Sequence, residues 1–109
     1  MQSGLCLRLY LCESDEIDHE PALEGIIKLC QEADLHSASI LRGVEGMGKH
    51  GIHSTSLLAL SSALPLIVEV VATEEVIQHA ITIIHKKLPS VTMTTWPVQI
   101  ISPSTHNVS

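Results

Sequence analysis

The N-terminal segment alternates between two kinds of side chain. From residue 4 to residue 12, leucine occupies every second position, and the positions between the leucines hold Cys6, Arg8, Tyr10 and Cys12. A period of two is typical of a β-strand with one buried face, because successive side chains point to opposite sides of a sheet. The pattern therefore predicts a strand over residues 4–12 whose leucines face a core.

A helical period follows an acidic connector over residues 13–20. Pro21 suits the first turn of a helix, because that turn does not need its N–H group. The apolar residues beyond it recur at helical spacing, which predicts a helix with one buried stripe that ends near Asp34 or Leu35. The stripe consists of Leu23, Ile26, Ile27, Cys30 and Ala33.

A second helix is expected after Thr73, which is a residue type that caps helix N-termini with its side chain. Lys86 and Lys87 would lie in the last turn, where positive charge favours the helix dipole, and Pro89 would end the helix. The predicted buried stripe consists of Ile77, Ile81, Ile84 and Leu88.

Three further segments have the character of strands. Residues 37–46 alternate less cleanly and run into a glycine-rich segment, which we interpret as a strand followed by a mobile loop. Residues 64–72 are dense in β-branched side chains, with Pro65 at the entrance. Residues 91–101 form the last predicted strand, which we expect to be weakened or bulged at Pro97.

The predicted order is β-α-β-β-α-β. This split βαβ arrangement forms a four-stranded antiparallel sheet with both helices on one face, so the fold class is α+β. The other face of the sheet stays open, and on the first strand it would present Cys6, Tyr10 and Cys12 around Arg8. A partly apolar open face indicates an oligomer that covers it.

Composition limits the size and the partners of the fold. The chain has 109 residues, of which 45% are hydrophobic, and this suffices for a single domain, predicted over residues 1–101 with a polar C-terminal tail over 102–109. A net charge of −6 and an aromatic content of 2% disfavour a nucleic-acid partner, which would need a basic face and stacking platforms.

The cysteines and the N-terminus point to a reducing compartment. Cys6, Cys12 and Cys30 are odd in number and form no Cys-x-x-Cys pair, so neither a disulfide framework nor a zinc knuckle is suggested. The first residues lack the basic region of a secretion signal, and no apolar run is long enough to cross a membrane. We expect a cytoplasmic protein without membrane insertion.

The glycine-rich segment resembles two phosphate-binding motifs in part. Gly43, Gly48 and Lys49 have the spacing of a Walker loop, but His50 stands where Ser or Thr would ligate magnesium. Residues 46–51 also satisfy G-x-G-x-x-G after a predicted strand, although the chain is too short for a doubly wound sheet. Two interpretations stay open, a flexible loop with a solvated Lys49 and a loop that binds an anion.

Histidine offers an alternative chemistry in the same segment. His50 and His53 have a spacing that suits a metal ion if a third ligand such as Glu45 lies nearby, and this would make the chain a small metal-binding module or a metal-dependent enzyme. Solvated histidines are the competing interpretation. No Ser/His/Asp or Cys/His arrangement stands out, and the chain is expected not to be an enzyme.

Several of these segments together resemble the uncharacterised PII-like proteins of bacteria and archaea, which are related to the nitrogen regulatory PII proteins. The matching runs are Leu41-Arg42-Gly43-Val44-Glu45-Gly46-Met47-Gly48, then Ile52-His53, then Leu60-Ser61, then Leu64-Pro65-Leu66-Ile67-Val68-Glu69-Val70-Val71. The likeness extends over about residues 4 to 101. Met47 stands where that family has an aromatic residue.

The resemblance implies a ferredoxin-like fold assembled as a homotrimer with the sheets inward. It also implies a long loop between the second and third strands that senses an effector and docks on a protein target, such as a transporter or an enzyme. The effector would be an adenine nucleotide or another anionic metabolite bound between subunits. Gly46, Gly48 and Lys49 would contact it, and His53 and Glu69 match the family motif without an assigned role.

Overall fold

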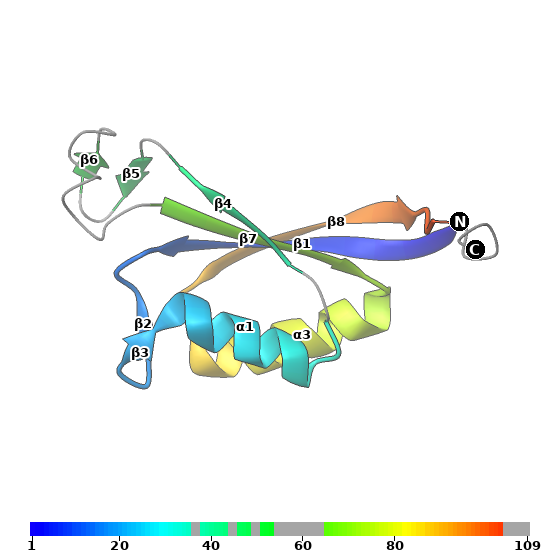
Figure 1. Ribbon diagram of the computed structural model, residues 1–109, viewed down its shortest axis with the longest axis horizontal. Coiled ribbons are helices and arrows are strands. Elements are labelled where there is room, and N and C mark those ends of the chain that lie inside the picture. Colours follow the sequence, from blue (N-terminus) through cyan, green and yellow to red (C-terminus); the bar gives the residue numbers. More distant parts are fainter. Residues whose placement is uncertain (36–37, 44–45, 49–50, 54–64, 104–109) are drawn as a thin grey trace.

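The computed structural model describes residues 1–35, 38–43, 46–48, 51–53 and 65–103. In these parts of the chain, the four strands of one sheet and two helices form the body, and two small hairpins accompany them (Figure 1). In chain order the elements are β1 (Gln2–Cys12), β2 (Glu16–Ile17), β3 (Glu20–Pro21), α1 (Ala22–Glu32), β4 (Ser39–Arg42), β5 (Gly46–Gly48), β6 (Gly51–His53), β7 (Pro65–Ala72), α3 (Glu74–Lys87) and β8 (Thr92–Ile100).

The main sheet has the strand order β4-β7-β1-β8, and every neighbouring pair is antiparallel. Figure 1 shows both helices packed under the same face of this sheet, and no helix or strand of the described residues covers the opposite face. The predicted fold class is thus confirmed: an α+β, ferredoxin-like arrangement with a four-stranded antiparallel sheet. No helix in the described parts of the chain is long and apolar enough to cross a membrane.

Strand β1 occupies the middle of the sheet and pairs along nearly its whole length with both β7 and β8. Its leucines face the helices, as predicted, and Leu7 and Leu9 are completely buried. The alternate residues of β7 continue this inner face. The largest fully buried side chains of the core are Leu7, Leu9, Ile26, Leu66, Ile77, Ile84, Val68 and Val70.

The two helices begin and end close to the predicted residues. Pro21 immediately precedes α1, and the chain leaves the helix through Ala33 and Asp34, whose φ of 63° lies in the left-handed region. The predicted side-chain cap at Thr73 is wrong: its side chain makes no cap hydrogen bond, and the first turn of α3 is closed by the Thr73 carbonyl, which accepts the Ile77 N–H at 3.0 Å.

The bulge expected at Pro97 is also wrong. The pairing of β8 with β1 runs without interruption through Trp96, Pro97 and Val98. Because β8 is an edge strand, the N–H groups on its outer side have no partner strand within the described residues, and a proline is tolerated there.

The sequence predicts a loop for the glycine-rich segment, but the structure places two short strands in it. Strands β5 and β6 pair antiparallel, which makes a small hairpin beside the end of β4 (Figure 1). The acidic connector likewise contains a two-residue pairing, between β2 and β3. Residues 104–109, most of the predicted tail, lie outside the described part of the chain.

Two glycines provide a matched test of how closely the strands pack. A Cβ added to Gly4 in β1 would collide with the Ala72 carbonyl oxygen at the end of β7, and the backbone would have to shift. A Cβ added to Gly25 in α1 would mainly meet the Cδ1 atom of Ile17, at 2.9 Å, which is the far end of a flexible side chain. The cost of adding a methyl group should therefore differ between the two positions.

We expect Gly4→Ala to lower the free energy of unfolding by about 1–3 kcal/mol, the range for forcing an extra methyl group into a packed site. Gly25→Ala should change it by less than about 1 kcal/mol, because the better helix propensity of alanine offsets the crowding. Urea unfolding at one fixed protein concentration measures both variants. Equal stability of Gly4→Ala and the wild type would contradict the register of β1 against β7.

Candidate functional site

Three of the candidate site residues belong to the two strands of the hairpin β5–β6. Gly46 lies opposite His53 across the hairpin, and Gly48 lies opposite Gly51. The segment that joins the two strands contains Lys49 and His50, which lie outside the described residues. Glycine has no Cβ, so the N–H groups of such a strand can approach an anion closely.

The base of this hairpin is tied to the main sheet. Gly43, the residue after β4, donates its N–H to the carbonyl of Pro65 at the start of β7, at 2.8 Å. Strand β4 itself pairs with β7 from Ser39 to Arg42. The chain therefore enters the glycine-rich segment from a fixed point at the edge of the sheet.

Glu69, the remaining candidate, lies elsewhere. It is four residues beyond Pro65 along β7, which places it about 13 Å from the start of that strand. Its Oε2 atom accepts a hydrogen bond from Nε of Arg8 in β1, at 2.6 Å. The two residues are directly opposite in the β1–β7 register, and both side chains project from the open face of the sheet.

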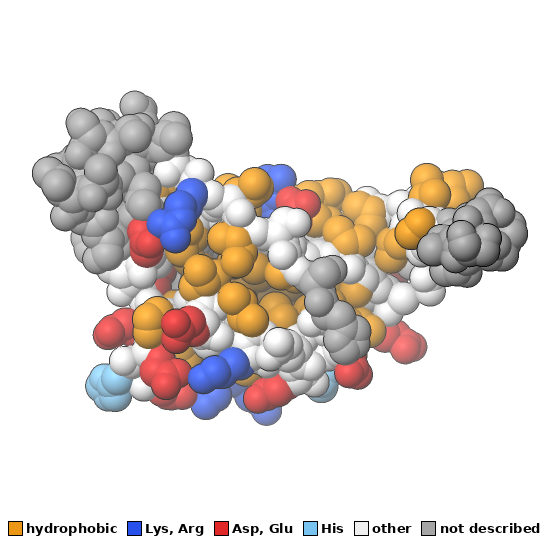
Figure 2. Space-filling view, in the orientation of Figure 1, with side chains coloured by type: hydrophobic (Ala, Val, Ile, Leu, Met, Phe, Trp, Pro, Cys, Tyr) orange, Lys and Arg blue, Asp and Glu red, His pale blue; other side chains and the backbone are white. Residues whose placement is uncertain are grey.

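The open face has a polar centre with apolar rows on both sides. The central row runs from Thr94 in β8 through Arg8 and Glu69 to Ser39 in β4. Along the top of Figure 2, where this face is seen from the side, neighbouring basic and acidic side chains interrupt the hydrophobic ones. The two flanking rows consist of Trp96, Cys6 and Val71, and of Thr92, Tyr10, Ile67 and Leu41.

The side chains around Arg8 hold its guanidinium in place. The guanidinium carbon lies 5.2 Å from the centre of the Trp96 ring, which is within the range of a cation–π contact. The Tyr10 hydroxyl lies 3.3 Å from Oγ1 of Thr94. Hydrogen bonding to Glu69, and after it to Tyr10, raises the pKa of Arg8 further above its ordinary value, so this cation is permanent.

Cys6 sits under this cluster and is only 2% exposed. Burial raises the pKa of its thiol above the ordinary value, and the negative charge of Glu69 raises it further. The thiol is therefore neutral near pH 7 and packs as a small apolar group. Cys30 in α1 is buried in the core, and burial raises the pKa of its thiol too.

Four large apolar side chains stay exposed on the open face: Tyr10, Leu41, Val71 and Trp96 are 39%, 47%, 46% and 38% exposed. They come from all four strands of the sheet. Arg8 and Tyr10 are predicted on this face by the alternation of β1, but the partnership of Arg8 with Glu69 and the position of Trp96 are not. Those depend on the register between distant strands, for which one sequence carries no local signal.

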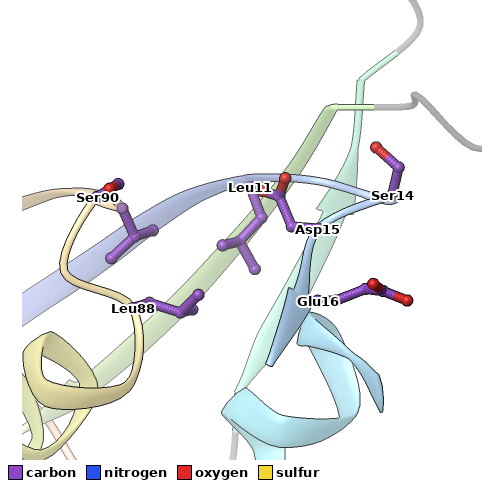
Figure 3. A pocket seen from close by; sticks show the side chains of 7 residues that line it. Leu11, Ser14, Asp15, Glu16, Leu88 and Ser90 are labelled. Carbon is purple, nitrogen blue, oxygen red and sulfur yellow. The ribbon is translucent and has the colours of Figure 1, made fainter. Parts of the chain in front are cut away.

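A hollow of about 360 Å³ lies on the other side of the molecule, where β1 ends and α3 meets β8. Leu11 and Leu88 form its apolar part. Figure 3 shows the polar ends of Ser14 and Glu16 turned away from Leu88, so the polar groups do not converge on one point. The arrangement offers no obvious set of contacts to a single ligand.

The described residues contain no cluster of side chains that would support the metal-binding alternative. No group of three or more His, Cys, Asp or Glu side chains lies close enough there to hold a metal ion. His50 and Glu45, two of the three ligands considered from the sequence, lie outside the described part of the chain.

Comparison with solved structures shows a shared fold. CPII, a nitrogen regulatory PII-like protein from Thiomonas intermedia bound to ADP, AMP and bicarbonate, superposes with a TM-score of 0.69 at 15% identity, covering 90% of this chain and 88% of that one. The GlnK–ATP complex of B. subtilis gives a TM-score of 0.58 at 11% identity, with 90% and 84% covered. At these identities the likeness establishes a PII-like fold.

Sequence comparison shows the family. A UPF0166 protein of Methanocaldococcus jannaschii is 31% identical over 75 residues, which are 69% of this chain and 69% of that protein. A UPF0166 protein of Aquifex aeolicus is 30% identical over 74 residues, or 67% of this chain and 70% of the relative. The sequence model of DUF190, described as "Uncharacterized ACR, COG1993", matches residues 4–100. The chain therefore belongs to the DUF190 (UPF0166) family and has a PII-like fold.

Proposed function

We propose that this chain is a PII-like regulatory protein without catalytic activity. It assembles as a homotrimer through the open face of the sheet and binds a small anionic effector, an adenine nucleotide or another anionic metabolite, in the clefts between subunits. The segment between β4 and β7 responds to the effector and docks on a protein target, such as a transporter or an enzyme. The observation that carries this proposal is the apolar open face within a PII-like fold.

The open face supports self-association on physical grounds. The opposite face of the same sheet packs on α1 and α3, which leave Leu7 and Leu9 of β1 completely buried, and only the β4 edge of that face has an exposed large apolar residue among those described, Ile40. The open face exposes apolar side chains from every strand. A contiguous apolar patch is typical of a protein interface. Aromatic residues and arginine are enriched at the centre of such interfaces, and here Trp96 and Arg8 lie together there.

The hairpin β5–β6 supports the binding of an anion. Gly46 and Gly48 lie on one short strand, with His53 opposite Gly46, and neither glycine has a Cβ atom that would hold an anion away from its own backbone. Lys49, which follows Gly48 in the sequence, would supply positive charge. The ligands that CPII carries, ADP, AMP and bicarbonate, are all anions. For Glu69, the hydrogen bond to Arg8 favours a role in the sheet face rather than direct contact with an effector.

If the chain self-associates through the open face, a new charge on that face should weaken assembly more than the same charge elsewhere on the surface. We expect Val71→Lys to convert the trimer into monomers, because assembly would bury an unpaired ammonium group. Ile27→Lys is the matched control: Ile27 lies on α1 and is exposed to a similar degree, 37% against 46%. That variant should sediment like the wild type.

Sedimentation velocity over a range of concentrations measures the oligomeric state of the wild type and of the two variants. A wild type that stays monomeric, or a Val71→Lys variant that remains trimeric, would contradict assembly through this face. Far-UV circular dichroism shows whether each variant is folded, so that loss of the trimer can be told from loss of the fold.

Effector binding at the hairpin predicts a role for Lys49. We expect Lys49→Ala to bind its anion at least about tenfold more weakly, because a hydrogen bond to a charged group contributes about 1.5–3 kcal/mol. The trimer should remain intact. Lys28→Ala is the matched control, since Lys28 lies on α1 and makes only an exposed ion pair with Glu20.

Isothermal titration calorimetry with ADP, AMP and bicarbonate measures the binding. Absence of any binding to the wild type, or affinities that are the same for Lys49→Ala, would show that the hairpin is not the site. Elemental analysis separates the metal-binding alternative: a stoichiometric metal that is lost in His53→Ala would favour it over the anion site.

A further inference from the structure

The open face has an ion pair at its centre, where a sheet that packs on another surface normally has apolar side chains. Arg8 and Glu69 are 34% and 28% exposed, and the rows on either side of them are largely apolar. Within one chain a partly exposed ion pair of this kind adds little to stability. The pair therefore calls for an explanation other than the stability of the monomer.

The geometry of the pair leaves capacity for further partners. A guanidinium carries five N–H donors, and the Nε–Oε2 contact with Glu69 uses one of them. A carboxylate accepts about four hydrogen bonds. Trp96 lies against the guanidinium and fixes its position, so that Arg8 is held ready in one orientation rather than moving freely in water.

The pair also makes the face complementary to itself. One cation and one anion lie side by side across the β1–β7 ladder, so in a ring of three copies each chain can set its Arg8 against the Glu69 of one neighbour and its Glu69 against the Arg8 of the other. Any orientation that sets like charges together is penalised, because charge repulsion at a desolvated interface is costly. A partner with a surface of one sign would not match both members of the pair.

We propose that Arg8 and Glu69 are positioning residues that select the arrangement of copies, each Arg8 contacting the Glu69 of a neighbouring copy as well as its own. This inference rests on the proposed self-association through the open face. The apolar rows would supply the driving force for assembly, and the ion pair would supply the orientation.

Charge reversal tests this pairing between chains. Arg8→Glu leaves two negative charges at the centre of the face, and Glu69→Arg leaves two positive charges. Each variant alone should associate at least about a hundredfold more weakly than the wild type, since like charges would meet in every orientation. The double variant Arg8→Glu/Glu69→Arg should regain the assembled species, because exchanging both charges sets opposite charges against each other again at every interface between its copies. It should not form mixed assemblies with the wild type, because like charges would meet where the two kinds of chain adjoin.

The Arg42–Glu13 pair gives a matched control. It is also an Arg–Glu contact of 2.6 Å, but it joins β4 to the acidic connector. Arg42 lies opposite Leu66, whose side chain faces the helices, so this pair is not on the open face. Arg42→Glu and Glu13→Arg should each assemble like the wild type.

Sedimentation velocity of each variant measures assembly, co-purification with a tagged wild-type chain measures mixing, and circular dichroism confirms folding. Single reversals that assemble normally, or a double variant that stays monomeric or mixes freely with the wild type, would overturn the pairing between chains and leave the proposed function standing. A monomeric wild type would overturn both. If a reversal variant does not fold, Glu69→Gln replaces it: we expect weaker association by about tenfold, and wild-type association would overturn the inference.

Discussion

The register of β1 within the sheet is the constraint on which the rest of the structure depends. This strand pairs with β7 on one side and with β8 on the other, so its alternation decides the two faces of the sheet at once. A slip of one residue would turn the leucines away from the helices and bury Arg8 between the sheet and the helices. At Gly4 the two strands lie so close that a side chain there would collide with the end of β7.

Strand β7 connects the two parts of the candidate site. Its first residue, Pro65, holds the base of the glycine-rich hairpin through Gly43, and Glu69 further along forms the ion pair of the open face. If the hairpin binds an effector and the open face binds other copies, both events act on the same strand. Through this strand, ligand binding in one chain can change the strength of association at the interface between chains.

Local patterns in the sequence predict most of the fold. The alternation of β1, the apolar stripe of α3 and the β-branched run of β7 each depend on neighbouring residues, and they agree with the structure. The stripe predicted for α1 is wrong at one position: Ile27 is 37% exposed, and Leu29 is buried in its place. The failures depend on more than the neighbouring residues: the Thr73 side chain makes no cap hydrogen bond although Thr73 directly precedes α3, and Pro97 fits because β8 lies at an edge. The pairing of Arg8 with Glu69 joins positions 61 residues apart, and only the assembled sheet brings them together.

The fluorescence of Trp96 tests the account most directly, because this is the only tryptophan in the chain and it lies on the open face. In a single chain its side chain is 38% exposed, so acrylamide should quench it readily. If copies cover the face, quenching should be weak at high protein concentration and should increase on dilution, in step with dissociation. Equal quenching at all concentrations, in a protein that sediments as an assembly, would show that the copies associate through some other surface.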